Sequence, residues 1–192
     1  EEMAGENHVF SPAYRPEEIE KIAAICDHVI FNSFNQLRRF GPLIKRIQEM
    51  RGVEHGIGLR INPECSTQDH AIYDPCAPGS RLGVTAEAFA EAVAASPEFF
   101  DLLGGLHFHT LCEQDSPALA KTLAAVREKF GSWLKRGNIC WLNMGGGHHI
   151  TREDYDRGLL IELVRKAREE YDVDVYLEPG EAVALNAGYL VT

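Results

Sequence analysis

The sequence predicts an α/β fold in which parallel strands alternate with helices. Short, continuous apolar runs are separated by longer segments that are polar on one face, the pattern of buried strands followed by amphipathic helices. The unit repeats about six times, and strands joined in this way run parallel, with the helices outside. Polar residues also gather where the apolar runs end.

Each expected strand is one of these short apolar runs. A last strand is expected to start at Gly188. The earlier runs lie at residues 8–11, 29–32, 56–62, 105–109, 139–143 and 173–178.

The expected helices are rich in Ala, Leu, Lys and Glu and are polar on one face. Thr85 ahead of Glu87, and Thr151 ahead of Glu153, are typical of helix N-terminal caps. The helical segments lie at residues 16–26, 37–50, 85–95, 117–135 and 152–171.

From the residues alone, two architectures remain open: a doubly wound sheet and a (β/α)8 barrel. Six units are too few to close an eight-stranded barrel, but the chain starts and stops on expected strands, as a barrel without its first and last units does. No domain boundary interrupts residues 1–192. The polar, irregular stretch 63–83 follows the third strand, and loops of that length are usually functional or mobile.

Composition narrows the function classes. With 45% apolar and 25% charged residues the chain is expected to be globular, and its net charge of −10 argues against nucleic acid or an anionic membrane as partner. No apolar run approaches the roughly 18 residues of a membrane span. Five cysteines without a Cys-x-x-Cys pair indicate a reducing compartment, which predicts a cytoplasmic location. The acidic opening without an initiator Met suggests that an upstream part is missing.

Three glycines, Gly145 to Gly147, follow the fifth expected strand. Glycines at a strand-to-helix junction let backbone N–H groups approach an anion such as a phosphate, although a tight turn alone would also explain them. His148 and His149 come next and are interpreted as capping or rim residues, with metal ligation as the less favoured reading.

His107 and His109 lie two residues apart on an expected strand and therefore share one face. Such a pair could hold a divalent metal, or place one ring against a cofactor. Glu178 ends the sixth strand and could bind a metal, accept a hydrogen bond from a protonated ring nitrogen, or pair with Arg60.

The motifs "GLRINPE", "SRLGV", "GLHFHTLCE", "NMGGGHHIT" and "LEPGEAV" together resemble the fold-type III pyridoxal-phosphate (PLP) decarboxylases, which are alanine racemase-like barrels. The details "FHTLCE", "GGGHHIT" and "EPGE" are most similar to the branch that decarboxylates carboxynorspermidine or carboxyspermidine in polyamine biosynthesis. The resemblance implies a PLP-dependent carboxy-lyase and a homodimer, with residues 1–192 forming the central portion of one PLP-binding barrel.

The resemblance also implies roles for individual residues. His109 would stack on the PLP ring, and Glu178 would pair with the pyridinium nitrogen, keeping it protonated so that the ring accepts electrons. These two are the expected catalytic residues. The remaining expected cofactor contacts are Gly145, Gly146 and Gly147 at the phosphate, Arg60 near the cofactor, and Cys112 where a relative has a phosphate-binding serine.

Glu181 departs from the family pattern, because most relatives have arginine there. Phosphate binding would then depend more on backbone N–H groups, and a glutamate would rather face a cation. Glu113, Asp115 and Glu181 could bind the protonated amines of a polyamine-like substrate. His148 is expected to help shape the substrate pocket.

The lysine that binds PLP covalently in this family has no counterpart here. All six lysines fall in helical segments, and the resemblance places the missing one upstream of Glu1. The chain is therefore expected to lack the first and last barrel units and the C-terminal β-domain, and to be inactive by itself. The alternatives are a metal-dependent barrel hydrolase using His107, His109, His148 and Glu178, and a non-catalytic PLP-binding barrel.

Overall fold

The computed structural model describes residues 5–68 and 70–189, which contain one six-stranded parallel sheet. The strands follow one another across the sheet in chain order. They are β1 (His8–Phe10), β2 (His28–Phe31), β3 (Ile57–Arg60), β4 (Gly105–His107), β5 (Trp141–Asn143) and β6 (Asp174–Tyr176).

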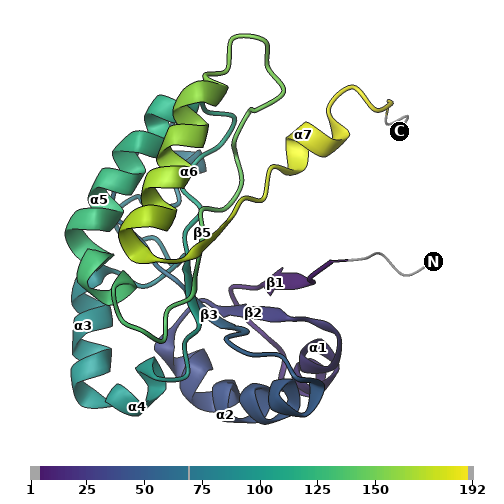
Figure 1. The fold of residues 1–192 in the computed structure, drawn as a ribbon, viewed down its shortest axis with the longest axis vertical. Helices are drawn as coiled ribbons and strands as arrows, with labels where there is room; N and C mark the ends of the chain where they lie inside the picture. The colour runs from purple at the N-terminus through teal and green to yellow at the C-terminus, as the bar shows by residue number, and fades with distance from the viewer. Residues whose placement is uncertain (1–4, 69, 190–192) are drawn as a thin grey trace.

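This strand order decides between the two architectures. A doubly wound sheet reverses direction at a switch point, whereas here each strand pairs with the next one without a reversal. Helices cover the outer side of the curled sheet, and β1 and α7, the first and last elements, lie at its open side (Figure 1). The fold is an open part of a (β/α) barrel, which confirms the predicted α/β class and partial barrel.

The helices occupy most of the predicted segments. In chain order they are η1 (Pro16–Glu18), α1 (Ile19–Ile25), α2 (Phe34–Arg51), η2 (Ala71–Tyr73), α3 (Ala86–Ala95), α4 (Pro97–Phe100), α5 (Ser116–Leu134), α6 (Arg157–Tyr171) and α7 (Gly180–Ala184). Within the described residues, no helix has the length and apolar character needed to cross a membrane.

The predicted start of α6 is wrong. Thr151 does not cap the helix; instead, the Asp156 carboxylate accepts a hydrogen bond from the Leu159 N–H at 2.8 Å, and the helix begins at Arg157. The segment before it forms turns, because the Arg157 guanidinium donates to the carbonyls of Ile150 and Arg152. By contrast, the predicted cap of α3 is confirmed, since Thr85 accepts from the Ala88 N–H.

The strand expected from Gly188 is not present at its first two positions, because Gly188 and Tyr189 have no regular structure. The rest of that expected strand lies outside the described residues.

The two faces of the sheet carry different side chains. Residues such as Phe31, Leu59 and Leu142 point outward and pack with the helices in the main hydrophobic core, which includes Phe89 and Phe130. The residues that alternate with these along each strand point to the concave face, because successive side chains of a strand point to opposite faces. The concave face, which is the barrel interior, is where the site is built.

The aromatic layer of the concave face consists of His8, His28, Trp141 and Tyr176. The His28 ring stacks on Trp141 with centroids 4.6 Å apart and on His8 at 4.0 Å, and Tyr176 meets all three rings edge-on. Trp141 fits because its neighbours in the sheet are glycines: a Cβ at Gly105 would overlap the indole ring.

Candidate functional site

A second set of concave-face residues, the polar layer, lies nearer the carboxyl ends of the strands. It consists of Arg60, His107, Asn143 and Glu178. The first three are register neighbours at the ends of β3, β4 and β5, and Glu178 follows β6. The carboxyl ends of parallel strands are where α/β barrels carry their active sites, so this end is the candidate site.

Glu178 is the centre of the polar layer. The Asn143 side-chain amide donates to its Oε1 at 2.8 Å, and His107 Nε2 lies 3.6 Å from its Oε2. Burial would raise the pKa of Glu178, but the contacts with His107 and Asn143 outweigh it and lower the pKa to about 2. Burial also lowers the pKa of His107. Glu178 is therefore an ionised carboxylate that accepts a hydrogen bond from the Asn143 amide and has the His107 ring beside it.

Arg60 is a buried cation beside this carboxylate. Its guanidinium lies 4.7 Å from the centre of the Phe10 ring and donates to the His109 carbonyl at 3.1 Å. Burial lowers its pKa to about 10, which leaves it charged at neutral pH.

The three glycines form a turn that packs against the segment after β4. Gly145 and Gly147 have φ values of +68° and +78°, which favour glycine, and a Cβ at Gly147 would overlap the Leu111 carbonyl. The N–H of Gly145 donates to Asn143 Oδ1 at 2.8 Å, and that of Gly146 to His109 Nδ1 at 3.3 Å. Two of the three N–H groups are thus used within the protein.

The contact with Gly146 also sets the state of His109. Because Nδ1 accepts a hydrogen bond, the proton of the neutral ring lies on Nε2. Burial, with help from the nearby Arg60 cation, lowers the pKa of His109, so the ring is neutral at neutral pH. The glycine turn therefore holds this imidazole in one orientation and one tautomer.

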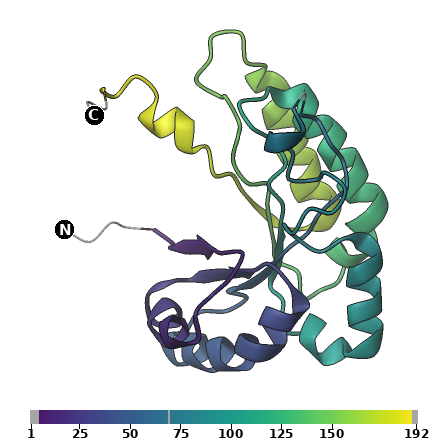
Figure 2. The ribbon, with the colours of Figure 1, turned by 180° about the vertical axis from the view of Figure 1, so that it is seen from behind.

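A cavity of about 570 Å³ opens at this end of the sheet, within the size range of small-molecule sites. Six of the predicted site residues line it: Arg60, His109, Cys112, Glu113, Gly147 and Glu181. The irregular stretch 63–83 supplies Tyr73, Pro75 and Leu82 to the wall. In the view from behind, the part of stretch 63–83 that contains η2 lies at the same end of the sheet as the loop after β5 (Figure 2).

The other predicted site residues do not line this cavity. Of the three glycines, only Gly147 is a lining residue, and Glu178 lines a second cavity of about 320 Å³ together with Asn143. His148 is only 1% exposed, and neither ring nitrogen has a hydrogen-bond partner among the described residues. Its buried position does not support direct substrate binding.

Two residues acquire a role that the sequence did not indicate. His149 Nε2 lies 3.2 Å from Glu181 Oε1 and links the glycine turn to the loop after β6. Asp115, interpreted above as an amine-binding residue, instead accepts from the N–H groups of Ser116 and Asp156. The position of His149 after the glycines was a signal, but its partner lies in a different loop.

No lysine among the described residues lines the cavity. Lys129 contacts Glu64 and the Pro63 carbonyl, and the other lysines are exposed on helices or, for Lys135, at the end of α5.

The metal-hydrolase alternative finds no support in the geometry. Within residues 5–68 and 70–189, only one group of three or more ligating side chains lies close enough to hold an ion. It does not include His107, His109, His148 or Glu178.

Comparison with known proteins decides the family. The model of the pyridoxal-dependent decarboxylases, pyridoxal binding domain, matches residues 8–185. The chain belongs to this family. The predicted resemblance is confirmed, and with it a pyridoxal-type cofactor as the group for which this decarboxylase domain is built.

Individual relatives are carboxy-lyases of polyamine-like compounds. The chain is 41% identical, over its whole length, to the carboxynorspermidine/carboxyspermidine decarboxylase of Campylobacter jejuni, and 36% identical to the carboxyaminopropylagmatine decarboxylase of Synechocystis. A crystal structure of carboxynorspermidine decarboxylase complexed with norspermidine, from Campylobacter jejuni, matches 93% of this chain and 42% of that one. Its TM-score is 0.75 at 38% identity.

The chain covers 46% of each of the two relatives named first. It therefore spans about half the length of these pyridoxal-dependent decarboxylases.

Proposed function

We propose that this chain forms part of a PLP-dependent enzyme that decarboxylates carboxynorspermidine or carboxyspermidine, yielding norspermidine or spermidine in polyamine biosynthesis. The observation that carries the proposal is one cavity that contains both an oriented imidazole, His109, and two carboxylates, Glu113 and Glu181. The relatives named above act on compounds of this class.

The residues at the strand ends fit the cofactor. PLP, when bound, supplies an electron sink for the bond that breaks as carbon dioxide leaves. Glu178 suits a protonated ring nitrogen, because its carboxylate stays ionised and Asn143 fixes its orientation. His109 lines the cavity with a neutral ring, and Gly147, Arg60 and Cys112 line the same cavity and are the residues that we propose hold the phosphate.

The acidic residues suit the part of the substrate that carries protonated amines, called its tail below. Glu181 lines the cavity, and its carboxylate lies 3.2 Å from His149 Nε2. Glu113 lines the same cavity with a φ of +51°, a conformation uncommon outside glycine. Two carboxylates in one cavity attract protonated amines by charge-assisted hydrogen bonds and disfavour a second substrate carboxylate.

The remainder of the proposal concerns the whole protein. Because no lysine of the described residues lines the cavity, we infer that the covalent cofactor lysine comes from another part of the polypeptide. A cytoplasmic homodimer is part of the same proposal.

The test is to measure carbon dioxide release by the full-length protein, supplied with PLP, from carboxynorspermidine, carboxyspermidine and diaminopimelate. We expect turnover of the first two and a kcat/KM for diaminopimelate that is lower by about 100-fold or more, because the cavity carries acidic groups. Binding of PLP without turnover of any of these would favour the non-catalytic barrel.

Glu181→Gln sharpens the substrate assignment. It should raise KM for carboxynorspermidine about tenfold and leave kcat nearly unchanged, because it removes one charge-assisted contact to the tail. An unchanged KM would show that Glu181 does not bind the substrate amine.

A further inference from the structure

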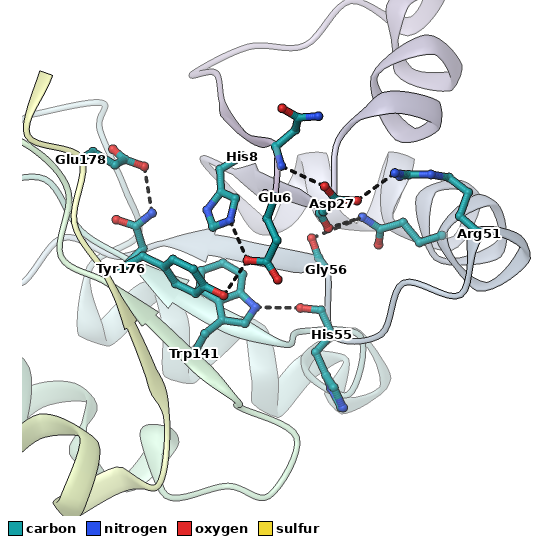
Figure 3. A network of polar contacts seen from close by, with 12 residues as sticks. Glu6, His8, Asp27, Arg51, His55, Gly56, Trp141, Tyr176 and Glu178 are labelled. Carbon is teal, nitrogen blue, oxygen red and sulfur yellow. Dashed lines mark hydrogen bonds and ion pairs between the residues drawn. The ribbon is translucent and has the colours of Figure 1, made fainter. Parts of the chain in front are cut away.

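A cluster of potential metal ligands lies in and beside the aromatic layer, away from the cavity at the strand ends. It consists of Glu6, His8 and His28, whose ligand atoms all lie within 4.8 Å of one another. Figure 3 shows Glu6 and His8 pointing toward each other beside Trp141 and Tyr176. We propose that these three side chains bind one divalent transition-metal ion of the zinc type, which joins the segment leading into β1 to β2.

The spacing of the cluster suits such an ion. Glu6 Oε2 and His8 Nε2 are 3.4 Å apart, and two ligands on a tetrahedral zinc ion with bonds of about 2.1 Å are separated by about 3.4 Å. A His28 nitrogen lies within 4.8 Å of both atoms. Because a ring nitrogen binds a metal in the plane of its ring, the partly exposed His8 ring must turn out of its stack on His28 for both rings to face one ion.

His28 provides an independent observation. Its side chain is 5% exposed, and its Nδ1 is buried without a hydrogen-bond partner among the described residues. An unpartnered buried nitrogen costs free energy, so the His28 ring has unused capacity to bind a partner.

Tyr176 holds the Glu6 carboxylate in place. Its hydroxyl donates to Glu6 Oε2 at 2.8 Å, and this hydrogen bond lowers the pKa of Glu6. Outer contacts of this kind orient metal ligands. Glu6, His8 and Tyr176 also line the cavity of about 320 Å³, which leaves a fourth coordination position open to water.

The experiment is a Co²⁺ titration of the full-length protein after treatment with a chelator. Cobalt in a tetrahedral nitrogen and oxygen site absorbs visible light more strongly than in water, so we expect a visible band that saturates at one equivalent. Zn²⁺ should remove the band by displacement and raise the melting temperature by about 4 °C or more.

Three variants locate the site. Glu6→Gln and His28→Phe should each abolish the visible Co²⁺ band. The phenylalanine of His28→Phe keeps an aromatic ring in the aromatic layer. Tyr176→Phe should weaken Co²⁺ binding about tenfold. His149→Ala is the matched control, because it removes a histidine–carboxylate pair elsewhere in the chain, and should leave Co²⁺ binding unchanged.

Three results would overturn the proposal. They are no saturable band in the wild-type protein, a band that persists in Glu6→Gln, and a band lost in His149→Ala. Because Glu6 is exposed, its substitution does not threaten the fold, and none of these readouts depends on PLP or on decarboxylation.

Discussion

The aromatic layer and the polar layer both face the concave side of the sheet, but they come mostly from different strands and their chemistry differs. In the aromatic layer, Trp141, His28 and His8 stack in sequence. In the polar layer, Glu178 is held by Asn143 and His107. Moving two residues along a strand keeps a side chain on the same face, so β5 contributes Trp141 to the aromatic layer and Asn143 to the polar layer. The comparison teaches that a residue used for packing and a residue of the candidate site can stand only two positions apart on one strand.

Glu178→Gln should show the largest effect, confined to catalysis. We expect kcat of the full-length enzyme to fall about 1000-fold, which corresponds to about 4 kcal/mol of activation free energy, because a neutral amide cannot keep the cofactor nitrogen protonated. The melting temperature should change by less than about 2 °C, since the glutamine can still bond to Asn143. Unchanged turnover would contradict the assigned role, and a large loss of stability would break the distinction between the layers.

Gly105→Ala should have the opposite profile. The added Cβ would overlap the Trp141 ring, so we expect unfolding free energy to fall by about 3 kcal/mol, measured by urea denaturation. Gly137→Ala is the control, because a Cβ there meets nothing within 4 Å. Equal effects in the two variants would mean that the aromatic layer is not tightly packed.

His28 should make the aromatic layer sensitive to acid. Its pKa is about 4 in the fold against an ordinary value of 6.5, because burial and the neighbouring His8 outweigh Glu6 and Asp27. The unfolded chain therefore binds more protons between these two values, and the stability present above pH 6.5 is lost as the pH falls toward 4.

Over that range, His28 should contribute a loss of about 2 kcal/mol. In the His28→Phe variant, the loss of unfolding free energy over this pH range should be smaller by that amount. The measurement is made in the presence of a chelator. His70→Ala, which changes an exposed histidine, is the control and should keep the wild-type slope. If His28→Phe also keeps that slope, His28 is not the acid-sensitive group of this layer.

The smallest effect is expected outside both layers, at the start of α6. Asp156→Ala should cost about 1 kcal/mol of unfolding free energy, because it removes the helix cap, whereas Thr151→Ala should cost almost nothing. Thermal denaturation measures the change in stability of both variants. These small changes are the reference with which the stability changes of the aromatic-layer and polar-layer variants are compared. A larger loss for Thr151→Ala would contradict the observed cap.

Much of the site could be predicted because the chemistry follows from strand ends. The positions of His107, His109 and Glu178 were evident where apolar runs give way to polar residues. The cap of α6 was missed because Thr151 and Asp156 carry equally good cap signals, and only the turn closed by Arg157 selects the second. The buried state of His148 was not visible, because adjacent residues in a turn have no fixed periodicity.

The sequence by itself determined the βα period, the family motifs and the list of polar residues at the strand ends, because alternation and helical periodicity are local properties. The tertiary structure decided which of them meet. Sequential strand pairing curls the sheet into part of a barrel, and that curvature brings Glu6 and His8 to His28 and Tyr176. Contacts between residues so far apart along the chain depend on register and curvature, which no local pattern encodes.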